Sequence, residues 1–237
     1  MRHAIKTGLK IVALVVVIAA AMRPAPAAAQ QSINFSFGGF SPRAEASRDP
    51  NDVLVQDRSF LDFNVGDLTG VTFSGEWLIG LGNNFDAGLG VGFYQNSTTA
   101  ADRFSEFDVT GDPILADLKL REVPFNATFR WLPLGRRAAV VPYIGGGVAV
   151  VGWRYSETGD FVASDNVTII HGNFVGSGAA VGPVIVGGVR VPVGTWTIGG
   201  ELKFQAAEGN LPPDQSFAGT KIDLGGFTYA FTFGVKF

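Results

Sequence analysis

The sequence contains no cysteine, which excludes disulfide bonds, thiol nucleophiles and cysteine-ligated metal sites. Beyond its first thirty residues it also lacks a continuous apolar run of about 20 residues, the length that a membrane-spanning helix requires. Histidine is scarce, with only His3 and His171 in the chain. Glycine, in contrast, accounts for 32 of the 237 residues. If such a chain lives in a membrane, it crosses the membrane with strands that close into a barrel.

The first 29 residues have the features of a signal peptide for export. Basic residues precede the apolar run 11–22, which is too short to span a bilayer as a helix. The small residues 27–29 then provide a cleavage site before Gln30. We therefore expect residues 1–29 to be removed and residues 30–237 to form a single exported domain.

The mature chain is acidic. Removal of the signal peptide takes away four basic residues and no acidic residue, which leaves 14 basic against 21 acidic residues and a net charge of −7. A nucleic acid partner requires a basic face that neutralises phosphates. The charge therefore argues against nucleic acid binding.

The last eleven residues alternate strictly between large apolar side chains and small or polar ones. This period of two is typical of a strand with one apolar face. The apolar face continues to the final residue, and its last five members are Tyr229, Phe231, Phe233, Val235 and Phe237.

Seven further segments alternate, although the Gly-rich segment 174–191 does so poorly, and the sequence therefore predicts eight strands. Long polar segments follow the odd-numbered strands, and short Gly- or Pro-containing turns follow the even-numbered ones. Apolar residues within the first long segment, 41–67, indicate that it extends the flanking strands; a ten-stranded alternative would need a hairpin there. The predicted strands are 33–40, 71–79, 85–94, 123–131, 140–155, 174–191, 196–205 and 227–237, and the other long segments are 95–117, 156–173 and 209–221.

Several motifs resemble the OmpA/OmpX-type family of small outer-membrane β-barrels. Val123-Pro124-Phe125 and the following Val141-Pro142-Tyr143-Ile144-Gly145 are similar to the central hairpin of that family, and the C-terminal aromatic strand resembles its insertion signal. The resemblance implies an all-β fold: an eight-stranded antiparallel up-and-down transmembrane barrel with long outer loops and short periplasmic turns. Aromatic residues near the strand ends are expected to form the interfacial girdles, namely Trp77, Phe93, Trp131, Trp153, Trp196 and Phe237.

Charged residues on the polar faces of the strands are candidates for a network inside the barrel. The strongest candidates are Glu76, Arg130, Glu201 and Lys203; Asp86, Arg154 and Arg190 extend the set. An eight-stranded barrel is just wide enough for side chains to fill its interior, where opposite charges must pair. The network could be a gate for a narrow water path or a static polar plug, and the barrel size favours the plug.

The sequence does not predict catalysis, a cofactor or a metal site. His171 is the only histidine of the mature chain, and its motif Ile170-His171-Gly172-Asn173 lacks the serine that a lipid hydrolase would need. Gly145-Gly146-Gly147 lacks the helix and the Lys-Ser/Thr of a phosphate-binding loop. The acidic stretch 49–52 lacks the ligand spacing of a calcium loop. We expect solvated loop residues at His171 and at 49–52, and at 145–147 strand glycines that permit bends and close packing.

These features predict a non-enzymatic protein of the bacterial outer membrane. We expect a structural scaffold that displays its loops, for adhesion or envelope integrity. The alternatives are a narrow pore or an OmpW-like conduit for small molecules, although a polar inner face argues against an apolar conduit. A lipid-modifying enzyme is the weakest alternative. Expected partners are outer-membrane lipids and lipopolysaccharide and, during biogenesis, the barrel-assembly machinery, with the protein a monomer.

Overall fold

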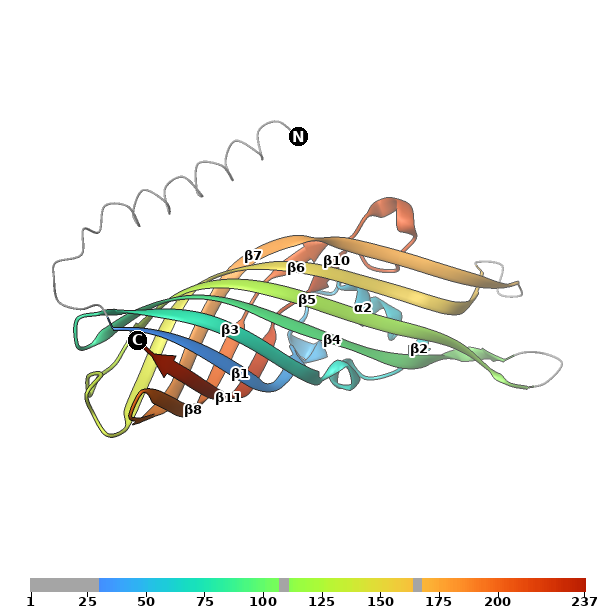
Figure 1. Ribbon diagram of the computed structural model, residues 1–237. Helices are drawn as coiled ribbons and strands as arrows, with labels where there is room; N and C mark the ends of the chain where they lie inside the picture. Colours follow the sequence, from blue (N-terminus) through green and yellow to red (C-terminus); the bar gives the residue numbers. More distant parts are fainter. Residues whose placement is uncertain (1–29, 107–110, 164–167) are drawn as a thin grey trace, which may run out of the picture.

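The computed structural model describes residues 30–106, 111–163 and 168–237 (Figure 1). The predicted signal peptide lies outside the described residues. Where the chain is described, no helix is long and apolar enough to cross a membrane.

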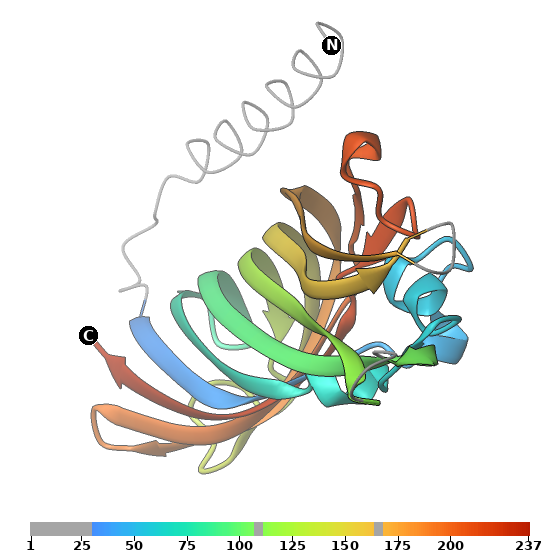
Figure 2. The ribbon, with the colours of Figure 1, turned by 90° about the vertical axis from the view of Figure 1, so that its right-hand side faces the viewer.

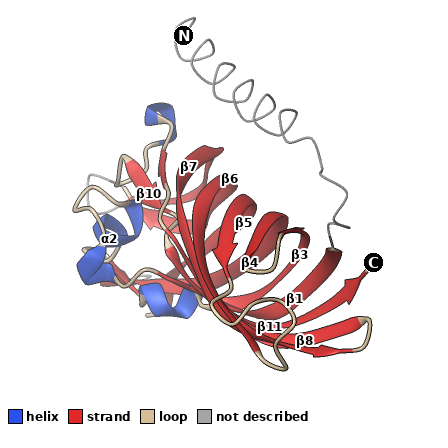
Figure 3. Ribbon diagram, turned by 90° about the vertical axis from the view of Figure 1, so that its left-hand side faces the viewer, coloured by secondary structure: helices blue, strands red, loops and turns tan. Residues whose placement is uncertain are grey.

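Eight antiparallel strands form a closed ring (Figures 1 and 3). Each ring strand pairs with the next ring strand along the chain, and the last, β11, pairs with the first, β1, to close the ring. The predicted eight-stranded up-and-down barrel is confirmed, and the ten-stranded alternative is wrong, because the remaining strands are two or three residues long and lie outside the ring. The ring strands are β1 (Gln31–Pro42), β3 (Gly70–Leu81), β4 (Phe85–Glu106), β5 (Pro113–Trp131), β6 (Val141–Val162), β7 (Ile169–Val193), β8 (Trp196–Gln205) and β11 (Gly226–Lys236).

The strands differ twofold in length, and this asymmetry shapes the molecule. Strands β4 to β7 have 19–25 residues, whereas β1, β3, β8 and β11 have 10–12. Most of the predicted loops 95–117 and 156–173 is therefore strand, a correction to the sequence-based boundaries. Figure 1 shows the long hairpins projecting at one end, with the short turns and the C-terminus at the other. Gln30 also lies at this second end, where its carbonyl accepts from the Gly80 amide. We call these the long-hairpin end and the short-turn end.

The outside of the ring carries an apolar belt. On β5 the belt covers residues 123–131, a length that matches the about 9–11 residues of a tilted membrane-spanning strand. Phe73 on β3 and Phe125 on β5 are both 55% exposed on this surface. The terminal strand shows the predicted alternation: of its five apolar residues, Phe231 is the most exposed at 81%, and Val235 is half-buried.

Two segments fill the barrel at the long-hairpin end, and we call them together the plug. The first, 43–69, contains the short helices η1 (Glu45–Ser47), α2 (Val53–Asp57) and η2 (Val65–Leu68) and the strand β2 (Leu61–Asp62). The second, 206–225, contains β9 (Glu208–Asn210), η3 (Pro213–Gln215) and β10 (Lys221–Asp223).

The plug completes the wall above the short strands. β2 pairs with β4, β9 packs on β7, and the two segments join through backbone bonds from Thr220 and Lys221 to Asn51 (Figure 2). The prediction that residues 41–67 extend the flanking strands is wrong, because most of this segment forms short helices that pack against the long strands.

The main apolar core lies between the plug and the inner faces of the long strands. Val53 and Leu54 of α2 are fully buried there with Leu118 and Leu120 of β5 and Tyr155 of β6. Burial of apolar side chains is the main stabilising force of such a contact. The inner face of the barrel is therefore mainly apolar in its plug half, whereas it is mainly polar in its other half.

In the plug half the inner face of the strands is mainly apolar and the outer face mainly polar, which overturns two sequence-based assignments on β6. Trp153, predicted to belong to an aromatic girdle, points inward and is only 5% exposed within the core. Arg154, predicted for the inner polar face, is exposed on the outside. Beyond the belt the outer surface meets water and the inner surface meets the plug. Polar side chains there no longer indicate which face of a strand points into the barrel.

Candidate functional site

The four residues that the sequence nominated for a lumen network lie together inside the belt-spanning half of the barrel. Arg130 of β5 is the centre: its Nη2 lies 2.6 Å from Glu76 Oε1 and 3.1 Å from Glu201 Oε2. The Thr128 hydroxyl donates to the same Glu76 oxygen at 3.4 Å. Lys203, almost fully buried, borders the same space. Period-two alternation alone brings these side chains to one interior, because all four occupy inward positions of β3, β5 and β8.

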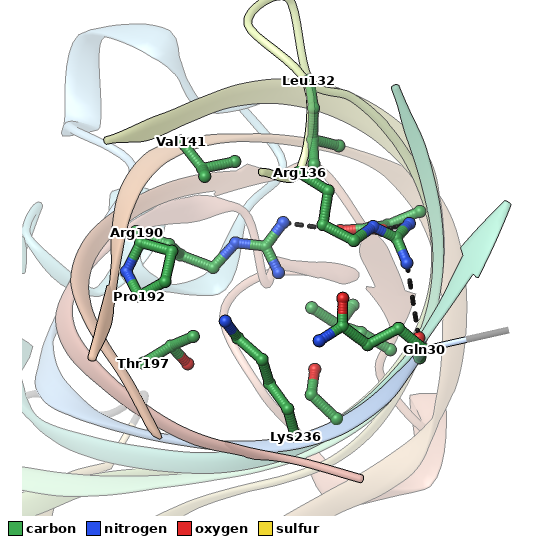
Figure 4. Close-up of a pocket in the computed structure, with 11 residues that line it drawn as sticks. Gln30, Leu132, Arg136, Val141, Arg190, Pro192, Thr197 and Lys236 are labelled. Carbon is green, nitrogen blue, oxygen red and sulfur yellow. Dashed lines mark hydrogen bonds and ion pairs between the residues drawn. The ribbon is translucent and has the colours of Figure 1, made fainter. Parts of the chain in front are cut away.

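A second cluster lies at the short-turn end. Asp86 of β4 accepts from two arginines: Arg136 Nη2 lies 2.6 Å from its Oδ1 and Arg190 Nη2 lies 2.5 Å from its Oδ2. Arg136 comes from the turn after β5 and also donates to the Phe85 carbonyl at 2.8 Å. Figure 4 shows Arg190 and Arg136 reaching across the opening, with Lys236 rising toward them from β11.

Tyr143 of β6 joins the two clusters. The guanidinium carbons of Arg130 and Arg190 each lie 4.9 Å from the centre of its ring, and its hydroxyl donates to Glu201 Oε2 at 2.9 Å. Cation–π contacts and charge-assisted hydrogen bonds both strengthen where water is excluded. The two clusters thus form one network along the barrel axis.

Little space remains around this network. The cavity beside Arg130 has a volume of about 20 Å³ and the one beside Lys236 about 30 Å³. A single water needs at least about 10–15 Å³ on this measure. Each cavity therefore has room for only one or two waters.

The network contains more cations than anions. Three acids, Glu76, Asp86 and Glu201, face five bases, Arg130, Arg136, Arg190, Lys203 and Lys236. With all of them charged, the interior has an excess of two positive charges. Any opening of this interior would favour anions over cations.

Sequence analysis missed three members of this network. Tyr143, Arg136 and Lys236 lie, respectively, on a glycine-rich strand, in a turn and next to the end of the chain. Tyr143 and Lys236 do carry a signal, since each keeps the inward register of its strand. No sequence signal predicts the position of Arg136, because strand periodicity does not extend into a turn.

The plug is attached to the wall by buried polar contacts. Gln205 of β8 donates to Glu122 Oε2 of β5 and to the Leu224 carbonyl of the plug, both at 2.9 Å. Arg48 and Asp52 form a buried ion pair at 3.0 Å, and Asp52 also accepts from the Leu54 and Asp223 amides. Asp52 was expected to be a solvated loop acid; that prediction is wrong, because this side chain caps α2 and ties the two plug segments together.

Two further carboxyl groups meet where the plug packs against β6, beyond the apolar belt: Asp57 of α2 and Glu157 of β6. Asp57 Oδ2 accepts from the Tyr155 hydroxyl at 3.1 Å, and the Glu157 carboxyl lies next to both groups. Burial, together with the nearby Glu157 charge, raises the pKa of Asp57 well above its usual range. Burial also raises the pKa of Glu157 to about 7. The pair therefore holds protons that free carboxylates would release at neutral pH.

The remaining candidates are the exposed His171 and the glycine triplet of β6. His171 Nδ1 lies 2.9 Å from Asp160 Oδ1 on the exposed β6–β7 hairpin, and Asp160 is its only side-chain partner among the described residues. Gly145-Gly146-Gly147 lies in the middle of β6, where a side chain at Gly147 would collide with the Ala127 carbonyl. In the described ranges, no three His, Asp or Glu side chains are placed to share a metal ion.

Comparison with solved structures identifies the architecture. The outer membrane protein OprG from Pseudomonas aeruginosa superimposes with a TM-score of 0.51 over 89% of this chain and 96% of its own, at 14% identity. The fold is that of the small outer-membrane β-barrels. Neisserial surface protein A (TM-score 0.46, 12% identity, 88% and 97% coverage) is also similar, as is AlkL (0.42, 15%, 91% and 95%). No family model matches the sequence, and no curated protein sequence matches it.

Proposed function

We propose that this outer-membrane-type barrel is a closed structural anchor of the bacterial outer membrane. In this proposal the signal peptide is removed before Gln30, and the long hairpins and plug face outward for adhesion or envelope integrity. The closed lumen carries the proposal, because the ion network fills one half and the apolar plug core fills the other. The C-terminal aromatic residues would serve as the signal for the barrel-assembly machinery.

Single-channel recording of the refolded mature protein in planar bilayers tests the anchor. We expect no openings from the wild type. Glu76→Ala and Arg130→Ala should also remain silent, because the plug closes the other half independently. Steady openings of the wild type would contradict the anchor. Openings only in the two variants would assign the network a gating role, with anion selectivity expected from its excess of positive charge.

A conduit for small apolar molecules is a second candidate function, supported by the apolar inner face of the plug half. Trp153, Tyr155 and Leu118 would line an apolar chamber if α2 moved away from them. Leu54→Asp should displace α2, since it places a charge among these side chains. Uptake of an apolar dye by vesicles containing this variant and by vesicles containing the wild type would favour the conduit. No uptake with either protein would favour the structural anchor.

We also propose that the protein is not an enzyme and that it works as a monomer. The exposed His171–Asp160 pair has no described hydroxyl partner, which supports the first proposal. Release of fatty acid from lipid A by the wild type but not by His171→Ala would contradict it. Sedimentation of the detergent-solubilised protein at twice the monomer mass would contradict the second.

A further inference from the structure

The apolar belt ends at one aligned row of residues on the four long strands. Gln95, Arg121, Arg154 and Ser177 are successive partners across β4, β5, β6 and β7. All four are exposed on the outside of the barrel. On the belt side of this row, Phe125 pairs with Val150, and both are exposed apolar residues. The row therefore marks the level at which the belt gives way to a polar surface.

Arg121 and Arg154 occupy adjacent places in this row, although both carry a positive charge. Directly opposed residues of an antiparallel pair lie about 4.5–5.5 Å apart between Cα atoms, and like charges in these places destabilise a sheet. Among the described residues, no carboxylate lies within 4 Å of either guanidinium to offset the repulsion. The pair is thus a cationic site without a neutralising anion in the part of the chain that the structure describes.

Neighbouring side chains extend this site away from the belt. Lys119 is the next outward residue on β5, and its partners Ser97 and Ser156 place hydroxyl groups on either side of it. The Arg121 guanidinium lies 5.4 Å from the centre of the Phe93 ring, which attaches it to the edge of the belt. Asp117, the next acid along β5, accepts from Thr99 at 2.6 Å, one outward position beyond Lys119.

We propose that Arg121, Arg154 and Lys119 bind a phosphate group of an outer-leaflet glycolipid of the lipid A type. Guanidinium groups bind phosphate in a bidentate manner, and a shared phosphate would turn the repulsion between the two arginines into attraction to a common anion. The acyl chains of the same lipid would lie along the belt beside Phe93, Phe125 and Val150. The assignment rests on the proposed orientation, in which the long hairpins face outward.

The test measures how lipid A stabilises the folded protein. The mature protein is refolded into phosphatidylcholine vesicles, with and without bisphosphorylated lipid A, and its urea unfolding midpoint is recorded. Lipid A should raise the wild-type midpoint, and in Arg121→Gln/Arg154→Gln its apparent affinity should fall about tenfold or more, because charge-assisted hydrogen bonds are lost. Arg137→Gln, in the exposed turn at the short-turn end, removes a positive charge elsewhere and should respond like the wild type.

Further outcomes separate the site from a folding defect. Without lipid A the double variant should be at least as stable as the wild type, because it lacks the repulsion between the two arginines. An equal response of wild type and double variant to lipid A would overturn the proposal. So would an equal stabilisation by inorganic phosphate or by lipid A stripped of its phosphates. None of these readouts depends on conductance, so the anchor and the lipid site can fail separately.

Discussion

At the scale of the residue, Arg130 has the most consequential position, because it separates two buried acids. Removing one member of a buried ion pair leaves an uncompensated charge and costs about 3–5 kcal/mol. We expect Arg130→Met to lower the free energy of unfolding by about 3 kcal/mol, measured by urea titration in vesicles. In a Glu76→Gln/Glu201→Gln background the same change should cost far less. An equal loss in both backgrounds would mean that Arg130 acts through packing and not through charge.

Phe231 tests which surface meets lipid. It is 81% exposed in the belt, whereas Phe104, beyond the belt on β4, is 79% exposed. Replacement of Phe231 by Arg should destabilise the protein in vesicles by about 2–4 kcal/mol, the range for a charge at the centre of a bilayer. Phe104→Arg, which makes the same chemical change in water, should be close to neutral. Similar losses for both variants would show that the belt is misplaced.

At the scale of the element, the plug depends on protonated acids. The folded-state pKa values of Asp57 and Glu157 lie above their usual 3.8 and 4.5, so the docked plug binds more protons than the undocked one. Docking is then fully stable below about pH 4 and weakens as the pH rises toward the Glu157 pKa of about 7. Quenching of Trp153 fluorescence by a water-soluble quencher should increase over this interval, because undocking of the plug exposes this side chain to water. Glu157→Gln should flatten the profile, and replacing the exposed Glu208 by Gln should leave it unchanged.

The elements also show how far sequence reasoning reaches. Within the belt, the outside faces lipid and the inside contains packed polar groups, so apolar and polar residues alternate along each strand. This alternation predicted the inner face for Glu76, Arg130, Glu201 and Lys203, and the structure has them there. Beyond the belt the environments reverse, and the same rule assigned Trp153 and Arg154 to the wrong faces. The plug was missed because its short helices gain their stability from burial against distant strands, and no local period records such contacts.

At the scale of the whole molecule, the two ends of the folded chain are neighbours. Gln31 and Phe237 exchange two backbone hydrogen bonds, of 3.2 and 3.0 Å, where β1 meets β11. A short linker could therefore join them, and new termini could be opened in the exposed turn around Leu134. Such a circular permutant keeps every strand pairing but moves the aromatic strand β11 to the middle of the sequence.

The permutant tests separately whether β11 stabilises the barrel and whether it is recognised by the assembly machinery. In detergent it should fold with an unfolding midpoint near that of the wild type, since the ring is the same. In cells its assembly should fail, if the machinery recognises Tyr229, Phe231 and Phe233 at a free chain end. Normal assembly would mean that the machinery recognises this aromatic pattern at any position in the sequence. The side-by-side ends of this ring thus allow the structural role of β11 and its proposed role as an assembly signal to be tested separately.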